Sequence, residues 1–219
     1  MNTATELRRW CATHNMPKNA LNWLDTLPND TPIQNVYEAC KRGDWLLWGL
    51  YHAGIKLEPV MPAVCAASNR AVREHLPIAL RAAGLNAEAE HLESLPEIVS
   101  TKTAEVAASA AAAAWATSKA ADTAWAAVSA AWAADTAARA ADATWTAPEA
   151  AAEAAAEVAR ASATATVTAT GADPADSWSV GWAAADAEHQ QCAEHVRALM
   201  PWETITKEIN PRILSTKGG

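Results

Sequence analysis

Apolar residues recur every three or four positions through most of this chain, and that spacing is typical of helices with one buried face. The first 96 residues hold several short stretches of this kind, separated by Pro, Gly and polar capping residues. One of them, residues 45–51 (WLLWGLY), is apolar nearly all round, so we expect it at the centre of a bundle. The pattern predicts an all-α protein with a compact N-terminal helical bundle.

Local signals place the ends of these short helices. Thr31 and Gln34 have the spacing of a capping box, with Pro at the first helical position between them. Gly43 is expected to end that helix in the left-handed conformation, and Asp44 to cap the next one. Gly84 is expected to stop another. Further helices are predicted at residues 58–76, 77–83 and 86–94.

The second half of the chain is rich in Ala and predicts longer helices. Residues 101–147 are compatible with one continuous helix, and Pro148 suits the first turn of another. Along this second helix Glu149, Glu153 and Glu157 lie four residues apart, and Arg160 follows three residues later. We interpret this charged row as a solvated face.

The C-terminal segment predicts one more long helix. Residues 162–170 alternate Thr with small residues, which suits helix or extended chain, and we favour helix. GADPADS, at 171–177, predicts a loop. A final amphipathic helix is expected at 179–200, with Trp182, His189 and Cys192 on its buried stripe, and a short helix after Pro201. We therefore expect long, Ala-packed antiparallel helices, closed by this C-terminal helix.

Within the helix predicted over residues 101–147, the stretch at 115–139 has two faces that differ in kind. One stripe, at steps of three and four, mixes Trp with short polar and charged side chains: Trp115, Ser118, Asp122, Trp125, Ser129, Trp132, Thr136 and Arg139. A second seam at the same spacing is entirely Ala: Ala120, Ala124, Ala127, Ala131, Ala134, Ala138 and Ala141. Small residues at every seam position predict unusually close helix packing.

The Trp stripe has two interpretations, and the sequence leaves both open. Its Trp side chains can pack against the N-terminal helices as ordinary core. Alternatively, they form the wall of a groove that stacks a planar ligand or anchors a protein, with the polar members and Arg139 for orientation. A third interpretation treats the Ala-rich stretch as a spacer of low complexity. Sequence change without selection would not preserve the regular spacing of the Ala seam, which argues against this interpretation.

Charge and composition narrow the classes of partner. The chain of 219 residues has 17 Lys and Arg against 25 Asp and Glu, so we expect no nucleic-acid binding and no attraction to anionic membranes. A small anionic ligand stays open, because a pocket needs only one or two local cations. The N-terminus lacks a signal-peptide pattern, and charged residues interrupt the Ala run, so a cytoplasmic protein is expected.

Candidate chemistry is sparse. His189, Cys192 and His195 are three residues apart, but the two histidines diverge around a helix, so we interpret His189 and Cys192 as buried core and His195 as exposed. Cys11 and His14 share a helix face without an orienting third group. The four cysteines are expected as reduced core thiols. No phosphate-binding loop is present. We therefore expect no enzyme activity, no cofactor and no metal site.

Two segments resemble a known group of proteins. RGDWLLWGL (Arg42 to Leu50) and CAEHVRALMPWETI (Cys192 to Ile205) are similar to segments of alanine-rich helical proteins of bacteriophages and bacteria, a group that is similar to proteins described as immunity proteins. The resemblance covers both ends of the chain, and the middle agrees only in composition. It implies a small cytoplasmic protein of phage–host or bacterial conflict that acts by binding.

The leading hypothesis for function is a non-catalytic binding protein, of the immunity or anti-defence type, that neutralises a host or phage protein. One alternative is a sponge that sequesters a small nucleotide-like defence signal. Another is a structural helical protein that forms homo-oligomers through its Ala seams. We expect two regions, a Trp-rich bundle at 1–96 and an Ala-rich region at 97–219, packed as one unit.

Overall fold

The structure is a computed structural model that describes residues 1–120, 150–170 and 174–208. These residues form helices and connecting turns, with one isolated bridge between Thr3 and Pro32 and no strand in the described ranges, so the predicted all-α class is confirmed. Among the described residues, none of the helices combines the length and the apolar character that crossing a bilayer requires.

The N-terminal elements are short. They are α1 (Ala4–Thr13), α2 (Lys18–Asp25), α3 (Ile33–Ala39), α4 (Gly43–His52), the 3₁₀ turn η1 (Glu58–Val60), α5 (Met61–Arg70), the π-helical turn η2 (Ala71–His75), α6 (Leu76–Ala82) and α7 (Asn86–Glu93). Gly84 has a φ of 80° and follows the end of α6, as predicted. The capping-box prediction is wrong, because Pro32 precedes α3 and no side chain caps that helix.

Longer helices follow. They are α8 (Thr101–Ala120), α10 (Ala150–Thr170), α11 (Pro174–Leu199) and the short α12 (Trp202–Glu208). Residues 162–170 are helical, as favoured from the sequence. The loop predicted at 171–177 is wrong from Pro174 on, since Pro174 begins α11. Proline is tolerated in the first turn of a helix because the backbone N–H that it lacks would have no partner within the helix there. Residues 121–147 of the predicted long helix lie outside the described residues.

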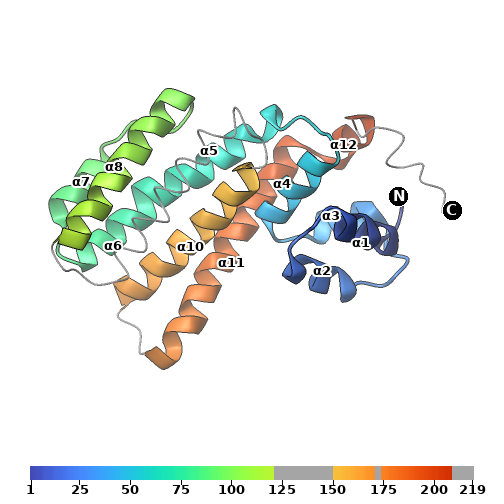
Figure 1. Cartoon of the computed structure of the whole chain (residues 1–219), viewed down its shortest axis with the longest axis horizontal. Helices are drawn as coiled ribbons and strands as arrows, with labels where there is room; N and C mark the ends of the chain where they lie inside the picture. The colour runs from blue at the N-terminus through green and yellow to red at the C-terminus, as the bar shows by residue number, and fades with distance from the viewer. Residues whose placement is uncertain (121–149, 171–173, 209–219) are drawn as a thin grey trace.

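The Ala-rich helix α10 lies at the centre of the described elements (Figure 1). It packs along α11 and also against α4, α5, η2 and α6. The first turns of α10 share a core with Cys192 and Val196 near the end of α11, and Gly181 near the start of α11 faces Val167 near the end of α10. The two helices are therefore antiparallel. Small side chains on α10 let several neighbours approach its axis at once.

The two ends of the molecule are formed by the short helices together with α8 (Figure 1). At one end, α1–α3 pack on α4 and α12, and the Tyr37 hydroxyl donates a 2.7 Å hydrogen bond to the carbonyl of Met200. At the other end, α6, α7 and α8 enclose a second core that contains Leu80, Leu92 and Ala107. Both cores include residues from before and after residue 96, although the division into two regions stays a prediction.

Gly43 has a different role from the one predicted. It begins α4, and its φ is not positive. A Cβ built at Gly43 would lie 2.5 Å from Sγ and 2.6 Å from Cβ of Cys192, so glycine is required by the close approach of α4 to α11. Residues 45–51 do lie at the core, since Leu46, Leu47 and Leu50 are buried.

Two burial predictions are wrong. Trp182, expected on the buried stripe of the last helix, is 61% exposed, because at this end α11 turns Gly181 towards α10 instead. Glu157, expected on a solvated face, is 4% exposed, because α10 has neighbours on most of its sides. Glu153 is exposed as predicted, and Glu149 lies outside the described residues.

Candidate functional site

Only the start of the predicted Trp stripe falls within the described residues. Trp115 is half-buried and packs against the core between α6, α7 and α8, and Ser118 is fully buried. These two residues thus lie on the packed side of α8, which suits the core interpretation for this part. The other members, Asp122, Trp125, Ser129, Trp132, Thr136 and Arg139, lie outside the described residues. Of the predicted Ala seam, Ala120 alone is described, and it is exposed.

His189 and Cys192, the imidazole and thiol that the sequence places in the core, are buried as expected. Their side chains are 5% and 3% exposed, and no group of His, Cys, Asp and Glu suited to a metal ion occurs in the described ranges. His195, expected to be exposed, is half-buried. Burial raises the pKa of Cys11 to about 12, and His14 Nδ1 lies 2.8 Å from the carbonyl oxygen of Trp10. Cys11 is thus a protonated core thiol.

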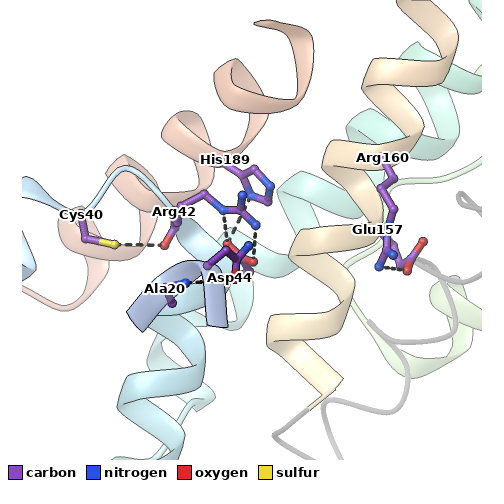
Figure 2. A network of polar contacts seen from close by, with 8 residues as sticks. Ala20, Cys40, Arg42, Asp44, Glu157, Arg160 and His189 are labelled. Carbon is purple, nitrogen blue, oxygen red and sulfur yellow. Dashed lines mark hydrogen bonds and ion pairs between the residues drawn. The ribbon is translucent and has the colours of Figure 1, made fainter. Parts of the chain in front are cut away.

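A buried polar network joins α4 to α11 (Figure 2). The Arg42 guanidinium donates to both carboxylate oxygens of Asp44, at 2.9 and 2.7 Å. Asp44 Oδ1 also lies 3.3 Å from Nδ1 of His189. Burial lowers the pKa of His189 to about 4, although the Asp44 carboxylate opposes this shift. His189 is therefore a neutral imidazole at pH 7, and the Asp44 carboxylate forms its main ion pair with Arg42.

A second buried carboxylate, Glu188, lies on the same helix and was missed from the sequence. Its two oxygens lie 2.9 Å from Arg70 Nε and 3.0 Å from His75 Nε2. Burial alone would raise the pKa of Glu188, but the hydrogen bond from His75 and the Arg70 guanidinium hold it below its ordinary value. The Glu188 carboxylate therefore connects α11 to the end of α5 through Arg70 and to η2 through His75.

The π-helical turn η2 positions these partners. Pro77 has no N–H, so it cannot donate to the carbonyl of Arg73 four residues earlier, and its ring would crowd that carbonyl in a regular α-helix. The chain widens instead, and Leu76 N–H bonds to the carbonyl of Ala71, five residues back. Such π-turns are frequent at functional sites. Here the turn carries Arg73 and His75 beside Arg70.

An open polar hollow of about 480 Å³ lies beside this turn. Its lining comes from α5, η2, α7, the segment after α7, and α11: Ala66, Asn69, Arg70, Arg73, Glu74, Glu93, Glu97 and Gln191. The Asn69 side chain fixes one wall, since its amide exchanges hydrogen bonds with the backbone N–H and carbonyl of Ile98, at 2.8 and 3.2 Å. The hollow therefore has a braced polar rim.

Of the two arginines that line this hollow, Arg73 has the weaker ion pair with a carboxylate. Arg70 is paired with Glu188, and Glu93 is paired with Arg81 at the rim. Arg73 Nη1 lies 3.7 Å from Glu97, beyond hydrogen-bond distance, and its Nε is buried without an acceptor among the described residues. The Arg73 side chain lines the hollow, and a guanidinium with so weak an ion pair is suited to an oxygen of a bound anionic group.

The hollow beside η2 could hardly be predicted from the sequence pattern. Pro77, four residues after Arg73, was the one signal available for an irregular turn. Arg70, Glu74 and Gln191 are ordinary polar residues of amphipathic helices, and their convergence depends on how α11 crosses α5.

Comparison with known proteins adds no relative. No protein-family model, curated protein or solved structure matches this chain. The resemblance to alanine-rich phage and bacterial proteins therefore stays a prediction, and function has to be inferred from the chain itself.

Proposed function

We propose that this chain is a non-catalytic binding protein that sequesters a small molecule with one anionic group in the hollow beside η2. The observation that carries the proposal is the Arg73 side chain, which lines a 480 Å³ hollow and whose Nη1 lies 3.7 Å from the Glu97 carboxylate, beyond hydrogen-bond distance. This is the form of the sponge hypothesis that the geometry supports best.

The charges of the hollow restrict the ligand. Its lining has two arginines and three glutamates, and Arg70 is already engaged by Glu188. A polyphosphate would meet net repulsion, whereas one phosphate or carboxylate matches the guanidinium of Arg73. Glu74 and Glu97 lie on the same lining and suit a positively charged or hydrogen-bond-donating part of the ligand. A nucleoside monophosphate, a cyclic nucleotide or an amino acid meets these requirements.

A panel of such compounds tests the proposal by thermal unfolding. A ligand that binds only the folded chain raises the thermal midpoint by mass action, and a compound at 100 times its Kd stabilises by about 2.7 kcal/mol. We expect one member of the panel to raise the midpoint of the native chain, and Arg73→Gln to abolish that rise. Arg9→Gln, at an exposed position on α1, is the matched control and should leave it intact.

Two results would contradict the proposal. One is an unchanged midpoint across nucleoside monophosphates, cyclic nucleotides and amino acids. The other is a rise that Arg73→Gln and Arg9→Gln leave equally large.

A second candidate function is neutralisation of a protein partner in phage–host conflict, and Trp182 favours it. This side chain is 61% exposed on α11, and Trp is the residue most enriched among the energetic centres of protein interfaces. We expect a stoichiometric partner from host lysate to bind the native chain and to be lost with Trp182→Ala. Because the side chain is exposed, this substitution should leave the thermal midpoint within about 2 °C. Retention of the partner by the variant would exclude Trp182 as its anchor.

A further inference from the structure

The hollow beside η2 gives a nucleobase no surface to stack on. Of the eight described residues that line it, none is aromatic and only Ala66 is apolar. Sites that hold a planar ring are lined mainly by aromatic and apolar side chains. The volume of about 480 Å³ lies within the range of roughly 300–1,000 Å³ that is typical of small-molecule sites. The hollow therefore suits a small ligand that is held by charges and hydrogen bonds.

The charges on the lining that have no strong partner add up to one negative charge. Two of the five charged side chains are paired with residues outside the lining, in the ion pairs Arg70–Glu188 and Glu93–Arg81. Arg73, Glu74 and Glu97 remain, with one positive and two negative charges. A ligand of complementary charge has one anionic and two cationic groups.

Arg73 and Glu97 suit the two charged groups at the head of an α-amino acid. Arg73 Nη1 lies 3.7 Å from Glu97 Oε1, and the two side chains are 31% and 71% exposed, so a ligand can reach both. The ammonium and the carboxylate of an α-amino acid are attached to the same carbon, so they also lie close together. The ligand carboxylate can accept from the Arg73 guanidinium while the ammonium donates to Glu97.

Glu74 supplies the remaining negative charge. It follows Arg73 in η2, its side chain is exposed, and none of the ion pairs within the described part of the chain includes it. Its carboxylate suits a second cation at the far end of the ligand. On the basis of the proposed function, on which this assignment rests, we propose that the ligand of the hollow is a free basic amino acid.

Four compounds test which groups of the ligand are recognised. They are L-lysine, L-norleucine (which lacks the terminal ammonium), Nα-acetyl-L-lysine (which lacks the α-ammonium) and adenosine monophosphate. Titrations of the full chain followed by two-dimensional ¹H–¹⁵N nuclear magnetic resonance measure affinities into the millimolar range. We expect lysine to bind most tightly, and norleucine and acetyl-lysine each to bind about tenfold more weakly, because each loses one charged contact.

Glu74→Gln locates the terminal ammonium. This variant should lower the lysine affinity about tenfold and change the norleucine affinity less than about threefold, because norleucine has no group that contacts Glu74. Glu105→Gln, which removes an exposed carboxylate on α8, is the matched control and should leave both affinities unchanged. Because Glu74 is exposed, its replacement should leave the thermal midpoint in place.

Several results would overturn the assignment of a basic amino acid. Tighter binding of adenosine monophosphate than of lysine would do so while the proposed function stands. Equal affinities for lysine and norleucine in the native chain, or a lysine affinity that Glu74→Gln leaves unchanged, would also do so. If none of the four compounds causes saturable shifts, the assignment fails, and the thermal panel decides the proposed function separately.

Discussion

Single residues in this chain have roles that depend on which helix passes beside them. Gly43 and Gly49 lie on the same helix, yet a Cβ at Gly43 would overlap Cys192 and one at Gly49 would meet nothing within 4 Å. Glu157 and Glu153 lie four residues apart, yet the first is buried and the second exposed. The spacing of apolar residues within one helix cannot distinguish such pairs, because it does not show which other helix packs beside each residue.

The two glycines make a matched prediction. Gly43→Ala should lower the free energy of unfolding by about 1–3 kcal/mol, because its Cβ forces α4 away from α11. Gly49→Ala should raise it by about 0.5–1 kcal/mol, since alanine favours the helix and meets no neighbour. Urea unfolding of both variants measures the two changes. Equal effects at the two positions would contradict the close approach of α4 and α11.

His189 predicts a dependence of stability on pH. Its pKa in the folded chain is about 4, against 6.5 for an ordinary histidine, so between these values the unfolded chain binds more protons. The contribution of the neutral His189 to the free energy of unfolding is therefore fully present above pH 6.5 and is lost as the pH falls towards 4. The loss reaches at most about 3 kcal/mol, from roughly 1.36 kcal/mol per pKa unit.

Urea unfolding between pH 7 and 4.5 checks this dependence. His189→Gln should flatten the decline over that interval, whereas His195→Gln, at a half-buried position on the same helix, should leave it as in the native chain. A decline that is the same in all three proteins would show that His189 is not the group that takes up the proton.

At the scale of elements, the sequence predicts most of the described helices within a few residues. Spacing, Gly84 and the prolines were sufficient for α6, α7 and α12, because these signals are local. The π-turn η2 was missed, since its cause is one absent N–H at Pro77 inside an otherwise regular apolar pattern. Helix α11 begins at Pro174, five residues before the predicted start at residue 179. The sequence does not indicate this start, because Pro174 and its small polar neighbours are also typical of loops.

Close packing through alanine on α10 has a direct test. Ala161 is fully buried and shares a cluster of small side chains with Ala67 and Ala71. Ala161→Leu should lower the free energy of unfolding by about 1–3 kcal/mol, because the added bulk must push α10 away from α5 and η2. Glu153→Leu adds apolar bulk on the exposed face of the same helix and should change stability by less than about 0.5 kcal/mol. Equal tolerance of both would show that the alanine contacts are not tight.

At the scale of the whole molecule, the arrangement follows from α10. Its small side chains allow α11, α4, α5 and α6 to surround one axis, and this brings Gln191 of α11 over η2 to complete the polar hollow. The sequence predicts long Ala-packed helices, but it does not say which helices they contact. The hollow depends on those contacts, so its residues could not be predicted, whereas the all-α class could.

Binding of a small anionic molecule in the hollow beside η2 can be measured by native mass spectrometry of the full chain, incubated in turn with a nucleoside monophosphate, a cyclic nucleotide and an amino acid. The mass reports the number of bound ligands on each chain. We expect one of these compounds to add a single ligand mass per chain, and this addition to be lost in Arg73→Gln and kept in Arg9→Gln. Bare protein with every compound, or an addition that Arg73→Gln retains in full, would contradict this expectation.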